Sequence, residues 1–274
     1  MTEDGLPPLR EVIERHGLAP KKSLGQNFLF DLNLTRRIAR AAQPFAGFTI
    51  VEIGPGPGGL TRALLAEGAG RIIAVERDER ALAALADIQA AYPGKLEIIS
   101  GDALTVDWST ISGPAKIVAN LPYNIGTPLL TGWLTGDAWP PWFKSLTLMF
   151  QKEVALRIVA KPGTEHFGRL SVLCQWRCTA HKLFDVNRSA FTPPPKVTSS
   201  IVQLVPLTPA IACDVKSLER LTAAAFGQRR KMLRASLRTV FDDPEVVLEN
   251  LGIAPTKRAE ELQINDFARL ALAL

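Results

Sequence analysis

The chain has 274 residues, 47% of them hydrophobic and 22% charged, and carries a formal net charge of +5 at pH 7. This composition is typical of a folded globular protein and excludes a disordered chain and a collagen. The 3 cysteines cannot all pair, which excludes a disulfide scaffold and indicates a reducing compartment. No cationic leader precedes an apolar segment, and no apolar run approaches the roughly 18 residues that span a bilayer. We therefore expect a cytoplasmic protein with no membrane partner.

Between residues 49 and 205, short apolar segments alternate with longer segments of helical period. The predicted strands are Thr49–Ile53, Arg71–Glu76, Leu96–Ser100, Lys116–Ala119, Ser145–Phe150 and Ser200–Val205. The predicted helices are Leu60–Glu67, Asp78–Gln89, Thr127–Leu134, Lys152–Ala160 and Arg169–Arg177, with Asp78 as the N-cap of the second. This alternation predicts an α/β fold with a mainly parallel sheet.

After Pro206 the strand pattern stops and only helical period remains. The helices predicted there are Ser217–Phe226, Gln228–Phe241, Pro244–Leu251 and Asp266–Leu274. The proline-containing segment Leu204–Asp214 is the expected linker. We therefore expect two domains, an α/β domain over residues 1–206 and a small all-helical domain over residues 207–274.

A glycine-rich turn follows the first predicted strand, with Gly54, Gly56 and Gly59 at G-x-G-x-x-G spacing. Glu76 ends the next strand, 22 residues after Gly54, where a carboxylate would face the vicinal hydroxyls of a ribose. Asp102 follows the third strand and could accept a hydrogen bond from the exocyclic amine of an adenine. Since three strands bring these groups to one edge of the sheet, the pattern predicts a crevice for an adenosyl ligand. A tight turn with solvated acids is the alternative.

The segment Asn120-Leu121-Pro122-Tyr123 follows the fourth predicted strand. The amine on C6 of adenine is a poor nucleophile because its lone pair is delocalised, so a methylating enzyme must localise that pair. The Asn120 side-chain carbonyl and the Leu121 backbone carbonyl could accept its two N–H groups. Pro122 would stiffen the turn, and Tyr123 could stack on a base extruded from its strand. A polar strand end with a β-turn and a core tyrosine is the alternative.

Cationic residues are concentrated between Lys216 and Arg238, where seven Lys and Arg residues occur with Glu219 as the one acid. Arg230, Arg234 and Arg238 follow one another at intervals of four residues, apart from the apolar face of the predicted helix. Such a stripe is typical of phosphate contact, with an ordinary solvated helix face as the alternative. The expected RNA-binding residues are Arg229, Arg230, Lys231, Arg234 and Arg238.

The ordered set of motifs resembles the ribosomal RNA adenine dimethyltransferases of the KsgA type. The matching segments are Lys22–Leu29, Val51–Thr61, Gly101–Ala103, Asn120–Tyr123, Phe191–Val197 and Arg229–Lys231, and they run in the family's order. The resemblance implies a Rossmann-like class I S-adenosylmethionine-dependent methyltransferase domain followed by a small helical domain. It also implies a metal-free monomer that methylates N6 of two adjacent adenosines in a hairpin loop near the 3′ end of 16S rRNA. The products would be N6,N6-dimethyladenosines, made in the assembling small ribosomal subunit.

The resemblance further implies roles for individual residues. The cofactor contacts it implies are Gln26, Asn27 and Leu29 at the methionine end beside Gly54 and Gly56, Glu76 at the ribose, Asp102 and Ala103 at the adenine, and Asn120 between cofactor and substrate. Phe191 would lie against the face of the target adenine opposite to Tyr123. Two positions depart from the family pattern, since Gly58 lies in an unusually glycine-rich stretch and Gly126 stands where serine is common.

Other functions share part of this pattern. A NAD-dependent dehydrogenase would use the glycine turn and Glu76 but would leave Asn120–Tyr123 unexplained. A DNA adenine methyltransferase would share the chemistry of that segment, and an RNA-binding assembly factor could keep the fold without turnover. Cys174, Cys178 and His181 would share a helix face and suggest a metal site, but no fourth ligand is evident, and we expect none.

Overall fold

The computed structural model describes residues 4–21 and 25–274. Lys22, Ser23 and Leu24, which open the first family motif, lie outside these residues. The chain divides into two compact units. The first unit comprises Met1–Trp133, Pro141–Ala155 and Lys182–Val205, and the second comprises Leu134–Pro140, Leu156–His181 and Pro206–Leu274. The unit that holds the C-terminal helices therefore also includes two earlier segments of the chain.

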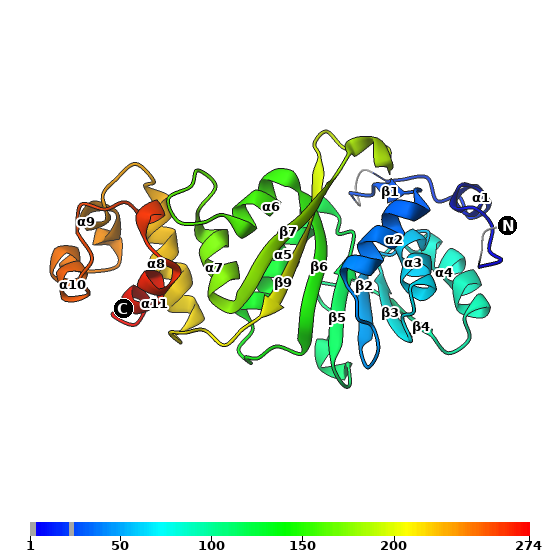
Figure 1. Ribbon diagram of the computed structural model, residues 1–274, viewed down its shortest axis with the longest axis horizontal. Helices are drawn as coiled ribbons and strands as arrows, with labels where there is room; N and C mark the ends of the chain where they lie inside the picture. The colour runs from blue at the N-terminus through cyan, green and yellow to red at the C-terminus, as the bar shows by residue number, and fades with distance from the viewer. Residues whose placement is uncertain (1–3, 22–24) are drawn as a thin grey trace. The chain divides into compact units, whose positions relative to one another are not determined.

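A seven-stranded sheet organises the α/β part, with strand order β4-β3-β2-β5-β6-β9-β7 (Figure 1). Its strands are β2 (Thr49–Ile53), β3 (Arg71–Glu76), β4 (Leu96–Ser100), β5 (Ala115–Ala119), β6 (Phe143–Gln151), β7 (Cys178–Val186) and β9 (Ser199–Pro206). Strands β2 to β6 pair in parallel, and β9 is antiparallel to β6. Every residue of β2 and β5 is buried, as expected for parallel strands covered on both faces. A separate antiparallel pair joins β1 (Phe28–Leu29) to β8 (Phe191–Thr192).

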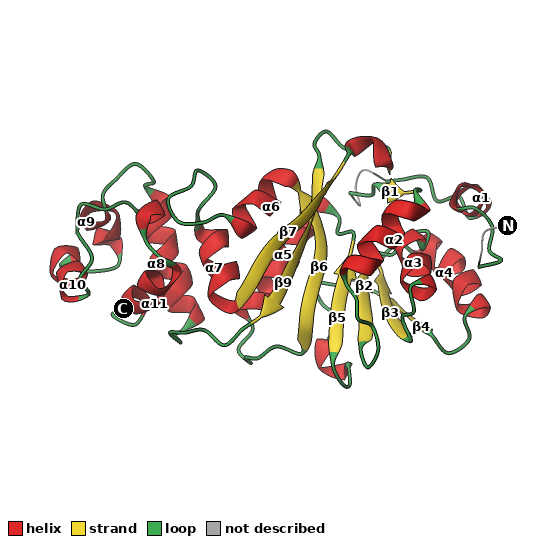
Figure 2. Ribbon diagram, viewed as in Figure 1, coloured by secondary structure: helices red, strands yellow, loops and turns green. Residues whose placement is uncertain are grey.

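Helices and strands are interspersed up to β9, and every element after β9 is helical (Figure 2). The helices before β9 are α1 (Leu9–Arg15), α2 (Leu32–Ala41), α3 (Gly59–Ala66), α4 (Glu79–Ala91), α5 (Tyr123–Thr135), α6 (Lys152–Val159) and α7 (Arg169–Arg177). The C-terminal helices are α8 (Val215–Gly227), α9 (Leu233–Ser236), α10 (Pro244–Asn250) and α11 (Ile264–Ala271). Across the described ranges, no helix has the length and hydropathy needed to cross a membrane.

Each unit has its own apolar core. Leu64, Ile72 and Leu85 are fully buried in the core of the first unit. The core of the second unit contains three neighbouring rings, Phe167, Phe226 and Phe267, with the last two stacked at 5.5 Å between centroids. Burial of such rings contributes most of the apolar stabilisation of a small helical unit.

The strongest sequence predictions are confirmed. Strands β2, β3 and β4 have the predicted bounds, and Asp78 caps α4 by accepting a hydrogen bond from the Arg80 backbone N–H. Helix α5 begins at Tyr123 rather than at the predicted Thr127. The predicted start lies too far along the chain because proline is common in the first turn of a helix, whereas Pro128 lies inside this one.

Strand β7 was not predicted, although it is nine residues long. Its exposed and covered positions alternate as in a half-buried strand. However, Leu183 is on the exposed side, with 38% of its surface accessible, while Lys182 is on the more covered side. This exchange of an apolar and a charged residue hides the alternation in the sequence. The short strands β1 and β8 and the helices α1 and α2 were also not predicted.

The predicted single helix Gln228–Phe241 is wrong. Helix α9 covers only Leu233–Ser236 and is followed by a 3-10 turn. The backbone N–H groups of Leu233 and Arg234 donate to the carbonyls of Lys257 and Pro255, at 2.7 and 3.1 Å. Since these amides bond to a distant loop instead of to the preceding turn, the chain before Leu233 cannot continue as helix.

The departure at Gly58 has a packing reason and yields a test. Gly58 has φ +85°, and a Cβ there would overlap Ile88 Cδ1. Gly94 has a similar φ of +75° but open space around it. We predict that Gly58→Ala lowers the free energy of unfolding by about 3 kcal/mol and Gly94→Ala by about 1 kcal/mol. Urea denaturation measures both, and equal losses would contradict the packing explanation.

Candidate functional site

A deep pocket lies at the carboxyl ends of β2, β3, β4 and β5, all within the first unit. Parallel pairing brings these strand ends to one edge, and the Gly54 N–H donates to the Val75 carbonyl at 2.9 Å. The pocket has an empty volume of about 1100 Å³, including its open mouth. Ligand pockets in α/β proteins typically form at this edge.

The pocket gathers all the residues expected to hold the cofactor and all of the Asn-Leu-Pro-Tyr segment. Its lining includes Gln26, Asn27, Leu29, Gly54, Gly56, Glu76, Asp102, Ala103, Asn120, Leu121, Pro122 and Tyr123. These residues come from five separate parts of the sequence. Their convergence supports the expected roles, which remain predictions.

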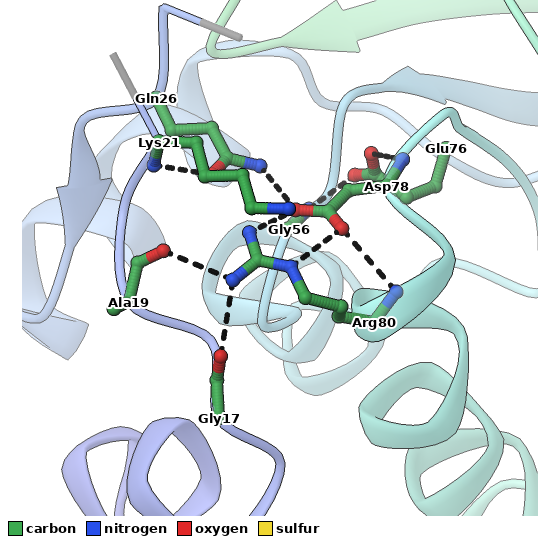
Figure 3. A network of polar contacts seen from close by, with 8 residues as sticks. All are labelled: Gly17, Ala19, Lys21, Gln26, Gly56, Glu76, Asp78 and Arg80. Carbon is green, nitrogen blue, oxygen red and sulfur yellow. Dashed lines mark hydrogen bonds and ion pairs between the residues drawn. The ribbon is translucent and has the colours of Figure 1, made fainter. Parts of the chain in front are cut away.

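The Glu76 carboxylate connects the glycine loop to the start of α4 (Figure 3). Glu76 has 6% of its surface exposed and accepts hydrogen bonds from the backbone N–H groups of Gly56, at 2.9 Å, and Asp78, at 2.7 Å. Burial raises the pKa of Glu76, although hydrogen bonds from the backbone N–H groups of Asp78, Gly56 and Arg77 oppose this change. A carboxylate can accept about four hydrogen bonds, so Glu76 retains capacity for the hydroxyls of a ribose.

Beside Glu76, the Asp78 side chain holds the segment that contains Gln26 (Figure 3). Asp78 Oδ2 accepts from Gln26 Nε2 at 2.9 Å and from Arg80 Nη2 at 2.6 Å. The Arg80 guanidinium lowers the pKa of Asp78 to about 2, so this carboxylate is ionised at neutral pH. Gln26 is thus fixed by a charged partner at the wall of the pocket.

Glu52, one residue before the carboxyl end of β2, is a second buried acid of the pocket wall. It is 1% exposed, and its Oε2 is 2.7 Å from the Thr61 hydroxyl. Burial raises the pKa of Glu52 to about 8, which leaves it mainly protonated at pH 7. Such a group adds a polar edge to the pocket without a full negative charge.

Asp102 and Asn120 occupy the ends of β4 and β5. Asp102 Oδ2 accepts from Arg77 Nη1 at 3.0 Å, and its Oδ1 accepts from the Leu104 backbone N–H. Asn120 Nδ2 donates to the Asn27 carbonyl at 3.3 Å. Because the amide nitrogen is directed to Asn27, the Asn120 Oδ1 is the atom that can accept from a substrate amine.

Tyr123 and Phe191 are not brought together. Tyr123 is half-buried at the pocket, and its hydroxyl forms a 2.6 Å hydrogen bond with Ser199 Oγ. Phe191 is 2% exposed, pairs with Leu29 across β1 and β8, and packs in the core outside the pocket lining. In this structure Phe191 therefore has no surface on which a base could stack.

The five expected RNA-binding residues lie in the second unit and differ in their contacts. Arg229 donates to the backbone carbonyls of Glu165 and Phe167. Arg230, Lys231, Arg234 and Arg238 are exposed, as is Arg229, and Arg234 lies 3.8 Å from Glu245. Arg229 thus has a structural role that the sequence did not indicate.

The Cys174, Cys178 and His181 spacing does not form a helical face. Helix α7 ends at Arg177, and Cys178 begins β7. Cys174 and Cys178 are buried, whereas His181 is exposed. Over residues 4–21 and 25–274, no cluster of three or more potential metal ligands is found.

Comparison with known proteins identifies the family. A sequence profile of the family described as ribosomal RNA adenine dimethylase matches residues 17–274. The chain belongs to this family. It is 62% identical over 270 residues to the ribosomal RNA small subunit methyltransferase A of Xanthobacter autotrophicus, covering 98% of this chain and 94% of that protein. Identity to the protein of the same name from Chelativorans is 61%, over 99% of each chain.

Two solved structures support the same assignment. A dimethyladenosine transferase from Plasmodium falciparum is 29% identical, with a TM-score of 0.75 and coverage of 89% of this chain and 95% of that one. The 23S rRNA methyltransferase ErmE is 25% identical, with a TM-score of 0.70 and coverage of 90% and 100%. The fold is that of the class I S-adenosylmethionine-dependent methyltransferases. As a member of this methyltransferase family, the chain is not a dehydrogenase.

Three parts of the site were missed in the sequence. Glu52 stands out as an acid between Val51 and Ile53 in a buried strand, which is a usable signal. The contact of Asp78 with Gln26 joins residues 52 positions apart and has no local signal. The same is true of Ser199, which lies 76 positions from Tyr123.

The raised pKa of Glu52 predicts a pH dependence of stability. A carboxyl whose pKa is higher in the folded than in the unfolded state costs stability progressively as pH rises between those two values. Glu52→Gln removes this cost, so its free energy of unfolding relative to wild type should increase by about 1 kcal/mol per pH unit between roughly pH 5 and 8.

Urea denaturation of the cofactor-free protein at several pH values measures this difference. Glu67→Gln is the matched control, because the ion pair with Arg40 lowers the pKa of Glu67, which keeps this carboxylate ionised in both states over the same pH range. The difference in stability between the Glu67 variant and wild type should therefore stay constant between roughly pH 5 and 8. A pH-independent difference for Glu52→Gln would contradict the assignment of a protonated Glu52.

Proposed function

We propose that the chain transfers methyl groups from S-adenosylmethionine to N6 of two adjacent adenosines in a hairpin loop near the 3′ end of 16S rRNA. The products are N6,N6-dimethyladenosines, and the acceptor is the assembling small ribosomal subunit in the cytoplasm. The protein acts as a monomer and without a metal. The observation that carries this proposal is the position of Asn120–Tyr123 at the wall of the pocket that also contains the glycine loop and Glu76.

The pocket residues fit an adenosyl cofactor. Gly56 has φ +55°, and a Cβ there would lie 3.0 Å from the Phe28 ring, so this turn of the pocket wall favours glycine. Glu76 is placed for the ribose hydroxyls, and Asp102 with Ala103 for the adenine. Gln26, Asn27 and Leu29 line the part of the pocket assigned to the methionine end. When bound, the cofactor supplies a methyl group on a sulfonium whose charge disappears in the transfer.

The residues of this chain then act on the amine. Asn120 Oδ1 and the Leu121 carbonyl accept its two N–H groups, which localises the nitrogen lone pair and directs it toward the methyl group. Tyr123 stacks on the extruded base, and its hydrogen bond to Ser199 limits rotation of the ring. No strong general base is required, because the amine proton leaves after the sulfonium charge has disappeared.

Two alternatives remain distinguishable by assay. A DNA adenine methyltransferase would share the Asn120 chemistry but would methylate DNA. An assembly factor that binds without turnover would be indifferent to the amide of Asn120. Two observations favour catalysis on rRNA. The chain matches the ribosomal RNA adenine dimethylase family, and it has both expected hydrogen-bond acceptors, Asn120 Oδ1 and the Leu121 carbonyl.

We predict that Asn120→Ala lowers kcat by at least about a hundredfold, because a positioned hydrogen-bond partner of the reacting group is lost. The assay follows labelled methyl transfer from S-adenosylmethionine to unmethylated small subunits, with the product nucleoside identified by mass spectrometry. Asn33→Ala, an exposed site on α2 outside the pocket lining, is the control. Wild-type activity in Asn120→Ala would exclude the proposed role, and wild-type binding of subunits without any transfer would favour an assembly factor.

The exposed cations of the C-terminal unit should contribute phosphate contacts. We predict that Arg230→Ala combined with Lys231→Ala weakens subunit binding and reduces the slope of log affinity against log salt by about 1 to 2. Removal of two charges at the amino ends of β3 and β4, by Arg71→Ala with Lys95→Ala, is the control. Filter binding at several salt concentrations measures both. Equal slopes for the two double variants would contradict a specific RNA contact.

A further inference from the structure

We propose that Arg80 is a positioning residue for the cofactor, which anchors the N-terminal segment around Gly17–Lys21 and Gln26 to the wall of the pocket through Asp78. This inference rests on the proposed function, because it assumes that the pocket binds S-adenosylmethionine. Arg80 itself is absent from the pocket lining, whereas Gln26 and Asp78 belong to it. The residue therefore acts through others.

The Arg80 guanidinium contacts two parts of the chain at once (Figure 3). Its Nε and Nη2 donate to the two oxygens of Asp78, at 2.9 and 2.6 Å. Its Nη1 donates to the backbone carbonyls of Gly17, at 3.0 Å, and Ala19, at 3.2 Å. One planar group thus links the segment that follows α1 to the first turn of α4.

Asp78 passes this restraint to the pocket. The Oδ2 atom bonded by Arg80 also accepts from Gln26 Nε2 at 2.9 Å, and Gln26 Oε1 accepts from the Lys21 backbone N–H at 3.0 Å. The backbone N–H of Asp78 donates to Glu76 Oε1 at 2.7 Å. Gln26, which is expected at the methionine end, and Glu76, which is expected at the ribose, therefore share one anchor.

The pair is shielded enough for this restraint to matter. The side chain of Asp78 is 5% exposed and that of Arg80 is 26% exposed. The Arg71–Glu97 pair at the amino ends of β3 and β4 is 47% and 53% exposed. Exposed pairs contribute little, whereas charge-assisted bidentate bonds to a buried carboxylate hold a defined geometry.

Loss of Arg80 should therefore affect binding more than chemistry. Asp78 would lose its bidentate partner, and the segment at Gly17–Lys21 would lose two hydrogen bonds. Cofactor binding would then have to order that segment and Gln26, which makes the free energy of binding less favourable. Asn120 and Tyr123 form no hydrogen bond with Arg80 among the described residues, so the rate of the bound complex should change little.

The test compares the Kd of S-adenosylmethionine for wild type, Arg80→Gln, Arg80→Lys and the control Arg71→Gln by titration calorimetry. We expect Arg80→Gln to raise Kd by roughly tenfold or more, and Arg71→Gln by less than about twofold. Lysine keeps the charge but not the planar fork, so Arg80→Lys should fall between them. Steady-state assays should show the change in the KM for S-adenosylmethionine, with kcat within about threefold of wild type.

Hydrogen exchange separates positioning from general destabilisation. In Arg80→Gln the amides of Lys21 and Gln26 should exchange faster, while those of β2 and β3 keep their protection. Gln26→Ala should raise Kd by itself, and Arg80→Gln should add less in the Gln26→Ala background than it does in wild type, because Arg80 acts on the cofactor through Asp78 and Gln26.

An unchanged Kd in Arg80→Gln, or equal losses in Arg80→Gln and Arg71→Gln, would overturn this inference alone. Additive effects of Gln26→Ala and Arg80→Gln would also overturn it, because they would show that the two residues act independently. Absence of S-adenosylmethionine binding by the wild-type protein would instead overturn the proposed function.

Discussion

The burial of one carboxylate, that of Glu76, organises the site. A buried acid must be hydrogen-bonded. Here the partners are the backbone N–H groups of Gly56 in the glycine loop and of Asp78, the N-cap of α4. Both segments are thereby fixed relative to the end of β3. Because β2, β4 and β5 run parallel to β3, their ends are fixed at the same edge. The remaining site residues depend on this arrangement.

The groups expected to bind the cofactor and the groups expected to act on the substrate amine lie at the ends of different strands. Acidic groups occur at the ends of β3 and β4, where a nucleoside is expected, and amide and carbonyl acceptors occur at the end of β5. Asn120 connects the two regions through its hydrogen bond to the Asn27 carbonyl. A residue that touches both the N-terminal segment and the acceptor position can couple cofactor binding to the orientation of the substrate amine.

Much of this arrangement could be predicted from the sequence, because it follows from local patterns. Strands β2 to β4 are apolar segments with clear ends, and the spacing from Gly54 to Glu76 marks a nucleoside crevice. Phe191 could not be placed, because its burial depends on the pairing of β8 with β1 across more than a hundred and sixty residues. The prediction of one helix over Gln228–Phe241 was wrong because the Leu233 backbone N–H forms a tertiary hydrogen bond in place of a helical one. The division at residue 206 stays a prediction.

The most direct test of the account is a crystal structure of the protein with S-adenosylhomocysteine, the product of methyl donation. The account predicts both ribose hydroxyls within hydrogen-bond distance of the Glu76 carboxylate, the adenine beside Asp102 and Ala103, and the sulfur facing Asn120. A nucleoside bound elsewhere, or bound with its ribose away from Glu76, would contradict the central role of this carboxylate.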